Sequence, residues 1–180
     1  LLVGSLAERI GFASNQLDAM RLFAKFHDIG KVGISDAILF KPGPLTEEER
    51  TEMRRHSEIG YRIALASSDL VYIAEWILRH HEWWDGSGYP IGLSGNEIPI
   101  ECRILSIADA FDAMTSDRPY RKAMSAEQAV KELRKFAGSQ FDPELLTVFC
   151  ELLQQEGEIF SIALCRHKRT SYFPCSSLSF

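Results

Sequence analysis

The hydrophobic residues of this chain recur at the spacing of an amphipathic helix through most of its length. In residues 17–29, one face of such a helix collects Leu17, Met20, Phe23, Ala24 and His27. This stripe predicts a helix that ends at Gly30, because glycine readily adopts the backbone conformation that closes a helix. We therefore expect His27 and Asp28 at the C-terminal end of that helix.

Capping residues mark where the next helices begin. Thr46 followed by Glu49 forms a capping box. It predicts a helix that runs to about residue 66 and carries His56. A third helix is expected over residues 70–81, ending on two histidines.

The C-terminal half of the pattern predicts three more helices. The first spans about 100–115, and its inward face is made of Ile104, Ile107, Ala108 and Phe111. Ser125 with Gln128 opens the second, and Asp142-Pro143 opens the third. No alternation of apolar and polar residues is long enough to indicate a strand. The predicted fold class is all-α, a multi-helix bundle.

Between Gly86 and Pro99 the chain is rich in glycine and proline, which predicts a loop. This loop is the best candidate for one wall of a substrate site. From about residue 157 the helical pattern fades. We expect one domain over residues 1–155 and a tail over 156–180, for which disorder, an attachment or a foreign sequence all stay open.

Composition narrows the class of protein. With 180 residues, 46% of them hydrophobic and 25% charged, the chain is an ordinary globular domain. Its net charge of −5 argues against a protein that coats long nucleic acid, because that mode of binding requires a broad Lys/Arg surface. A small phosphodiester ligand requires only local positive charge.

The cysteines and the first residues of the chain indicate the cellular compartment of the protein. Four widely spaced cysteines are typical of reduced thiols in the cytoplasm: Cys102, Cys150, Cys165 and Cys175. The sequence has neither a leader nor an apolar run long enough for a membrane span. Because residue 1 is leucine, we expect a longer parent protein, in which an upstream targeting, sensory or membrane segment stays open.

The histidines indicate the chemistry. Four of the five fall within one stretch of the chain: His27, His56, His80 and His81. With Asp28 and the downstream Asp109, they offer imidazole and carboxylate ligands for more than one metal ion. The adjacent pair of imidazoles also directly precedes the glycine-rich loop. That arrangement suits a metal site beside an anion pocket.

These motifs resemble the HD-GYP family, a branch of the HD metal-dependent phosphohydrolases. The resemblance is carried in order by His27 to Lys31, Lys41 to Gly43 with Leu45-Thr46, His56, His80 to Glu82, Asp85 to Pro90, Ala108 to Arg121, and Phe141 to Pro143. It covers about residues 1 to 155. It implies an HD-domain-like helical bundle with a Gly/Pro-rich substrate loop.

The resemblance also implies a function. Members of the family are bacterial phosphodiesterases that hydrolyse cyclic di-GMP to linear pGpG and often on to GMP. They use two or three clustered divalent metal ions, usually iron or manganese. An upstream sensory or receiver domain and a homodimer are further expectations, and long nucleic acid is not an expected partner.

Residue roles follow from the same resemblance. The positions that match metal ligands are His27, Asp28, His56, His80, His81 and Asp109, with Asp28 as the bridging carboxylate. Lys31 matches a lysine close to the metals and the scissile phosphate. The positions that match nucleotide contacts are Gly88, Tyr89, Pro90, Arg118 and Arg121.

Phosphodiester hydrolysis explains why such residues would be needed. Two metal ions ~3.5 to 4 Å apart hold a hydroxide between them and neutralise the charge that develops on the phosphoryl oxygens. A carboxylate such as Asp28 can bridge the pair because it has two oxygens. Lys31 adds a compact positive charge, and arginines can grip a second phosphate through two parallel hydrogen bonds.

Alternatives to this function stay open in the sequence. The site could act on another nucleotide, such as cyclic GMP-AMP or a nucleoside triphosphate. The chain could instead be a non-catalytic module that binds cyclic di-GMP or protein partners. The Gly88-Tyr89-Pro90 loop favours the first function over other nucleotides, and none of the motif ligands is lost within the given residues, which disfavours a non-catalytic module.

Three further residues receive structural or open assignments. Trp83 and Trp84 could stack on a guanine, but a structural role as buried or rim aromatics is favoured. Asp112 is interpreted as a neighbour of the site that is not a ligand. HD phosphohydrolases take a further histidine ligand from a helix upstream of the His-Asp pair. We expect that ligand before Leu1, since Glu8 is the only imidazole or carboxylate candidate ahead of Asp18.

Overall fold

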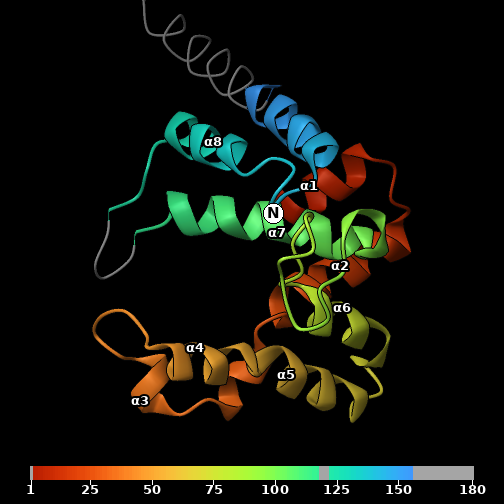
Figure 1. The fold of residues 1–180 in the computed structure, drawn as a ribbon. Helices are drawn as coiled ribbons and strands as arrows, with labels where there is room; N and C mark the ends of the chain where they lie inside the picture. Colours follow the sequence, from red (N-terminus) through yellow and green to blue (C-terminus); the bar gives the residue numbers. More distant parts are fainter. Residues whose placement is uncertain (1, 118–121, 156–180) are drawn as a thin grey trace, which may run out of the picture.

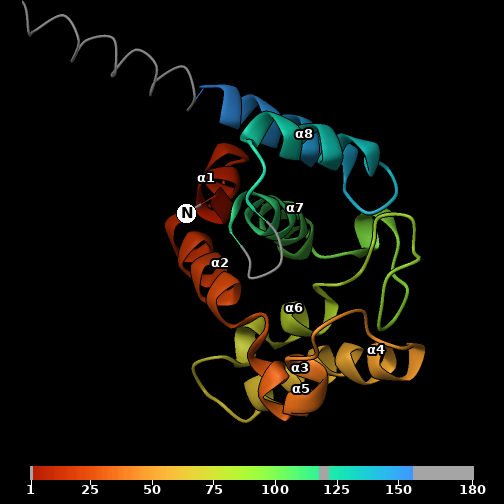
Figure 2. The ribbon, with the colours of Figure 1, turned by 90° about the vertical axis from the view of Figure 1, so that its left-hand side faces the viewer.

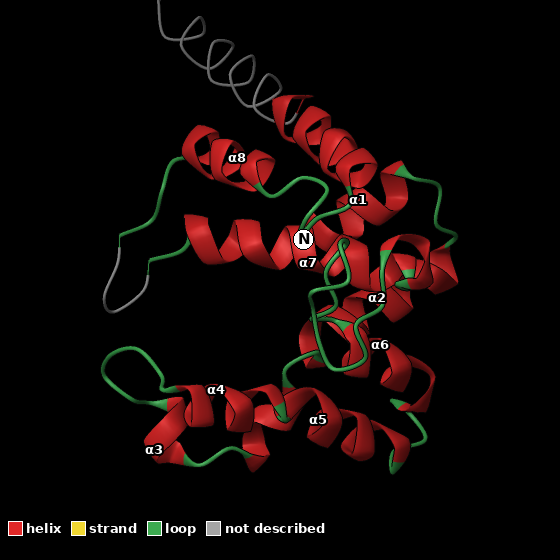
Figure 3. Cartoon of the chain, viewed as in Figure 1, coloured by secondary structure: helices red, strands yellow, loops and turns green. Residues whose placement is uncertain are grey.

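The computed structural model describes residues 2–117 and 122–155, and this part of the chain is helical (Figures 1 and 3). Its only β pairing is an isolated bridge between Ala137 and Phe141. The predicted all-α class is therefore confirmed. None of the helices in this part is both long and apolar enough to cross a membrane.

The helices follow one another with short connections. The α-helices are α1 (Leu2–Arg9), α2 (Ser14–Phe26), α3 (Asp36–Leu39), α4 (Glu47–Arg54), α5 (His56–Leu65), α6 (Ala74–Arg79), α7 (Ile100–Thr115) and α8 (Ala126–Lys135). The 3-10 helices are η1 (Ile29–Gly33), η2 (Val71–Ile73) and η3 (Gly95–Glu97). A last helix begins at 143 and runs to 155, where the described part ends.

Helix α7 forms the centre of the hydrophobic core. Figure 2 looks nearly along its axis and shows α1, α2, α6 and α8 around it. Its predicted inward residues are all buried: Ile104, Ile107, Ala108 and Phe111. Phe111 packs edge-to-face against Phe149 of the last helix, with ring centroids 5.3 Å apart. Each fully buried Ile or Phe contributes roughly 1.5–3 kcal/mol to folding, so this helix anchors the rest of the chain.

Helices α4 and α5 form a second layer, separated from α7 by α6 (Figure 1). Two glycines let η1 lie directly against α5. A Cβ on Gly30 would overlap the His56 carbonyl oxygen and the Gly60 amide nitrogen, and a Cβ on Gly60 would lie 3.2 Å from the Gly30 nitrogen. This backbone contact brings the segment that carries His27 and Asp28 against the start of α5.

Several predicted boundaries are corrected by the structure. The helix expected over 17–29 is Ser14–Phe26, so His27 and Asp28 follow it. Gly30 does not close that helix but lies buried inside η1. The third predicted helix, over 70–81, is divided into η2 and α6, and His80 and His81 lie in the turn after α6.

The helix predicted from the Thr46 capping box is also divided, although the box itself is present. Helix α4 ends at Arg54 and α5 begins at His56. The His56 ring nitrogen Nδ1 donates to the Met53 carbonyl at 2.7 Å, and the Ser57 hydroxyl donates to the Arg54 carbonyl at 3.1 Å. Side chains thus occupy carbonyls at the end of α4, which is a known way to interrupt a helix.

The remaining predictions of local structure hold. Helix α7 has the predicted bounds, and Ser125 and Gln128 form the capping box of α8. The Gly86 to Pro99 stretch is a loop that contains only the short η3. Cys102 and Cys150 are buried free thiols, as expected, whereas the other two cysteines and the tail over 156–180 lie outside the described residues.

Candidate metal centre

Four side chains from three helix junctions converge on one point. Asp28, His56, His80 and His81 each offer one ligand atom, and these atoms all lie within 4.8 Å of one another. Asp28 lies between α2 and η1, His56 begins α5, and the adjacent histidines follow α6. Residues that are up to 53 positions apart in sequence are thus within reach of a single ion.

The backbone fixes the orientation of three histidine rings. Each places Nδ1 against the carbonyl oxygen three residues earlier: His27 on Ala24 at 2.8 Å, His56 on Met53 at 2.7 Å and His80 on Ile77 at 2.7 Å. A carbonyl can only accept, so Nδ1 carries the proton. In a neutral ring Nε2 then presents a lone pair, which is the form that binds a metal.

The Nε2 atoms face one another. His56 Nε2 lies 3.3 Å from His80 Nε2 and 3.1 Å from His81 Nε2. His56 and His80 both carry the ring proton on Nδ1, so their two Nε2 lone pairs repel at this distance unless a cation lies between them. Two imidazole nitrogens on one metal ion, each ~2.1 Å from it, are separated by roughly 3.0–3.4 Å. The observed spacing therefore fits shared coordination, and the residues present fit a metal ion.

Asp28 lies between two groups of ligands. Its Oδ1 is 3.4 Å from His56 Nε2 and 4.0 Å from His80 Nε2, whereas its Oδ2 is 3.4 Å from His27 Nε2. On the far side of His27, Asp109 Oδ1 lies 3.9 Å from the same Nε2. One carboxylate oxygen thus faces each group, which is the arrangement required of a bridging ligand.

The protonation states suit metal binding. Burial, reinforced by neighbouring histidines, lowers the pKa of His80 to about 3 and that of His81 to about 2. Burial also lowers the pKa of His56. For His27, contacts with Asp28 outweigh burial and raise the pKa. The rings that surround Asp28 Oδ1 are therefore neutral near pH 7, as ligation requires.

The carboxylate of Asp28 is ionised over the same range. Burial alone would raise the pKa of Asp28, but hydrogen bonds from His27 and Lys31 hold it well below its ordinary value. Lys31 Nζ lies 2.6 Å from Asp28 Oδ2. The ammonium predicted near the metals is therefore at the edge of the cluster, in contact with the central carboxylate.

The predicted loop lies directly against the histidines. The Tyr89 ring stacks on the His81 ring with centroids 4.8 Å apart and planes inclined by 26°. The Tyr89 amide donates to the His81 carbonyl at 3.1 Å. A Cβ on Gly88 would lie 2.6 Å from that same carbonyl oxygen, so only glycine permits this approach. Pro90 follows Tyr89 through a cis peptide bond.

A cavity of about 200 Å³ opens beside the ligands toward α7. Its walls are His27, His80, His81, Glu82, Trp83, Leu105, Ser106, Asp109, Ala110 and Gln140. Trp83 is 37% exposed and lies at the rim of this wall. Trp84 instead packs against Arg103, whose guanidinium is 5.7 Å from the ring centroid.

Other predicted residues lie outside the cluster or outside the described part. Asp112 and Glu8 are exposed, and neither belongs to the converging group. Arg118 and Arg121, predicted to contact the nucleotide, are not among the described residues. Asp142 caps the last helix by accepting from the Glu144 amide at 2.9 Å.

Sequence reasoning missed the part played by Glu82. This carboxylate is only 3% exposed and accepts the backbone amides of Ile91, Gly92 and Leu93 at 2.7 to 3.2 Å. It holds the far end of the loop against the histidine turn. Its position directly after the two histidines was the only available signal, because its partners are backbone groups that have no signature in sequence.

A buried ion pair was also missed. Arg103 of α7 lies 2.9 Å from Asp142 Oδ2 and donates to Asn96 of the loop at 3.0 Å. It joins the loop, α7 and the start of the last helix. The pairing of residues 39 positions apart cannot be inferred from local pattern.

The sequence of this chain is similar to a known protein family and to curated proteins. The HD domain family profile matches residues 1–145. A cyclic di-GMP phosphodiesterase of Thermotoga maritima is 43% identical over 161 residues, which are 88% of this chain and 44% of that protein. The 3'3'-cGAMP-specific phosphodiesterase 2 of Vibrio cholerae is 42% identical over 148 residues, which are 81% of this chain and 28% of that protein.

A solved structure shares the fold. Bd1817, an HDG"Y"P protein from Bdellovibrio bacteriovorus, superimposes with a TM-score of 0.64 at 18% identity, over 85% of this chain and 49% of that one. The chain spans less than half the length of these curated relatives.

Proposed function

Because this chain belongs to the HD domain family, in its HD-GYP branch, we propose that it hydrolyses cyclic di-GMP to pGpG and onward to GMP. One observation carries the proposal. Ring nitrogens of His56, His80 and His81 converge with Asp28 beside the loop that bears Tyr89. A relative with 43% identity over most of the chain is a cyclic di-GMP phosphodiesterase.

We propose two divalent ions, iron or manganese, as the resident metals. Three imidazoles with carboxylates suit these ions or zinc better than magnesium or calcium. His56, His80, His81 and Asp28 would hold one ion, and His27, Asp109 and the other Asp28 oxygen a second. Bound metals would supply the charge that neutralises a phosphodiester and makes water a better nucleophile at neutral pH.

The chain's own groups would then hold and orient the substrate. Lys31 has its ammonium next to Asp28, where it can attract a phosphate oxygen. Tyr89 stacks its ring on His81, and burial raises the pKa of Tyr89, so the hydroxyl keeps its proton as a donor. Gly88 and Pro90 shape this loop. Its rigidity comes from the buried carboxylate of Glu82.

Other parts of the interpretation remain predictions from the resemblance. Contacts of Arg118 and Arg121 with the nucleotide fall in this group. So do a regulatory partner domain, a homodimer and a third metal ion. Residues 1–155 are proposed as the hydrolase domain, with no role assigned to 156–180.

Cyclic GMP-AMP is the second candidate substrate. It is favoured by the 42% identity to a 3'3'-cGAMP-specific phosphodiesterase. The two dinucleotides share the phosphodiester ring and differ in one base, so the metal cluster cannot distinguish them. A non-catalytic role is disfavoured, because all six residues predicted as ligands lie close to Asp28 or His27.

A competition assay tests the proposal. Manganese-loaded protein would be given equal concentrations of cyclic di-GMP, 3'3'-cGAMP and GTP, and the products separated by chromatography. We expect pGpG to appear first and GTP to remain intact. Faster loss of 3'3'-cGAMP would establish the second candidate, and release of only phosphate or pyrophosphate from GTP would refute both. Protein stripped with a chelator is the control and should be inactive.

A further inference from the structure

Arg54, the last residue of α4, lies over the substrate loop. Its guanidinium carbon is 5.0 Å from the centroid of the Tyr89 ring. The same ring stacks on His81, with centroids 4.8 Å apart. A cation, an aromatic ring and a candidate metal ligand are thus arranged in consecutive contacts. Arg54 ends α4, which forms one layer with α5, so it reaches Tyr89 from that layer.

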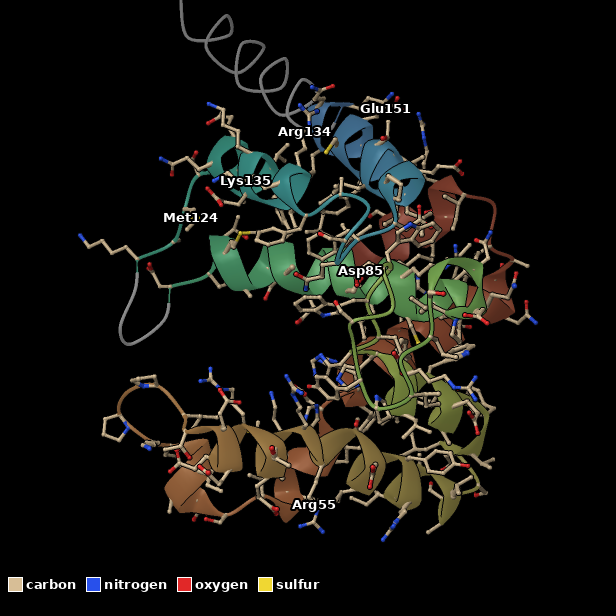
Figure 4. The ribbon with its side chains drawn as sticks, viewed as in Figure 1. Arg55, Asp85, Met124, Arg134, Lys135 and Glu151 are labelled. Atoms are coloured by element: carbon tan, nitrogen blue, oxygen red, sulfur yellow. The ribbon has the colours of Figure 1, made fainter. Side chains whose placement is uncertain are left out.

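The guanidinium of Arg54 has no anionic partner among the described residues, and no hydrogen bond to them. Its neighbour Arg55 differs: Nη1 of Arg55 contacts both Glu52 carboxylate oxygens at 2.8 and 2.9 Å. Figure 4 shows Arg55 on the outer side of this layer, directed away from α7. Two adjacent arginines therefore have different environments, one neutralised at the surface and one open beside the cluster.

Stacking leaves the hydrogen-bonding capacity of Arg54 available. A cation–π contact uses the face of the guanidinium, whereas its five N–H donors lie in the plane and point outward. Such a fork matches two oxygens of a phosphate. The Tyr89 ring fixes the side chain in position, which reduces the conformational entropy lost when an anion binds.

The neighbouring charges point to an anion at this position. Lys31 is already paired with Asp28. The Tyr89 ring lies between Arg54 and His81, and its hydroxyl is a neutral hydrogen-bond donor next to a cation. Two donors without a described acceptor lie on one side of the cluster.

We infer that Arg54 binds a phosphate of the dinucleotide substrate from the α4 side of the cluster, while Tyr89 holds its guanidinium in place. The inference rests on the proposed function, since it names a substrate contact for the same site. Arg54 is a binding residue and not a metal ligand. Its loss should weaken substrate binding and leave metal content unchanged.

Arg54→Gln tests the inference, with Arg55→Gln as the matched control one residue away. Both remove one positive charge from the same layer, so a general change of charge affects them equally. KM and kcat for cyclic di-GMP would be measured on manganese-loaded protein. Turnover of bis(p-nitrophenyl) phosphate, which has a single small phosphodiester, would report on the metal cluster alone. Calorimetric titration of chelator-treated protein with cyclic di-GMP would measure binding without metal.

We expect Arg54→Gln to raise KM for cyclic di-GMP about 10-fold or more, the usual cost of a lost charged hydrogen bond. Its kcat, metal content and turnover of bis(p-nitrophenyl) phosphate should stay close to wild type. The affinity of chelator-treated protein should fall to a similar degree, and KM should depend less on salt. Arg54→Lys should recover part of the affinity, because it restores the charge but not the fork.

An Arg54→Gln protein that binds cyclic di-GMP as tightly as wild type would overturn the inference. So would an equal loss in Arg55→Gln, which would show a general charge effect. Failure of the proposed function gives a different result. In that case wild-type protein would not cleave cyclic di-GMP, yet Arg54→Gln would still lose affinity for 3'3'-cGAMP, which carries the same phosphates.

Discussion

Replacing Glu82 by glutamine should loosen the substrate loop without emptying the metal cluster. Glu82 is 3% exposed, and its two oxygens accept amides of Ile91, Gly92 and Leu93 at 2.7 to 3.2 Å. Glutamine keeps the shape but replaces one oxygen with an NH₂ group. That group is a donor facing other donors, so at least one amide is left without its acceptor.

The expected loss in the free energy of unfolding follows from the hydrogen bonds that the substitution removes. A hydrogen bond to a charged group contributes about 1.5–3 kcal/mol, and a buried donor left without a partner costs a similar amount. Because Ile91 is 54% exposed, water can reach part of this loop and reduce the penalty. We expect the free energy of unfolding to fall by about 2–4 kcal/mol, or the loop to open locally where that costs less.

Urea unfolding followed by tryptophan fluorescence measures the effect, because Trp83 and Trp84 adjoin Glu82. KM for cyclic di-GMP should rise as Tyr89 becomes less ordered, while metal content should be retained. The control is Glu97→Gln in the same loop, an exposed carboxylate that accepts only from Ser94 at 3.1 Å. It should change stability by less than about 1 kcal/mol. If Glu82→Gln matches this control in both stability and KM, the anchoring role is wrong.

Three further outcomes are expected. Gly30→Ala should cost about 1–3 kcal/mol of stability and reduce metal content, because its Cβ overlaps the His56 carbonyl. The control is Gly4→Ala, where a Cβ meets no atom within 4 Å. It should change neither quantity in parallel urea-unfolding and metal-content assays. Metal-free protein should lose about 2 kcal/mol of stability from His80 alone as pH falls from 6.5 to 5. The folded pKa of His80, about 3, lies below the unfolded value, so the unfolded state binds the extra proton. A free energy of unfolding that stays constant over that pH window would contradict the buried neutral ring. Lys31→Gln should lower kcat/KM for cyclic di-GMP about 10- to 100-fold with metal content retained, since it removes a charge beside the phosphate; unchanged kinetics would show that the ammonium only balances its neighbouring carboxylate.

The sequence predicted those elements whose boundaries are set locally. Helix α7 has a regular apolar face, and its bounds are correct. The capping boxes at Thr46 and Ser125 are likewise formed by residues three positions apart. In each case the partners lie within one turn of each other, so the pattern contains the information needed.

The sequence did not predict where the helices near the site stop. His27, His56 and His80 donate from Nδ1 to backbone carbonyls, and the helical pattern ends or breaks at each of them. Periodicity extends through these positions because the rings are half apolar and lie on the buried face. Gly30 was mispredicted for a similar reason. Glycine is needed there because the backbone contacts α5, and not because it ends α2.

For the site, the residue types were predictable and their connections were not. His-Asp and His-His pairs predict candidate ligands, and the structure brings four of these residues together, Asp28 among them. The supports are backbone amides for Glu82 and a distant carboxylate for Arg103, and neither leaves a local pattern. The cation over Tyr89 likewise comes from a different helix.

The central claim is that Asp28 holds two metal ions on which turnover depends. The most direct measurement compares metal stoichiometry and cyclic di-GMP turnover in Asp28→Ala and in Asp112→Ala, an exposed carboxylate on α7. Loss of Asp28 should empty the cluster and reduce turnover about 100-fold or more, with circular dichroism still showing a helical protein, while Asp112→Ala should match wild type in all three. Full metal content and wild-type turnover in Asp28→Ala would contradict the account.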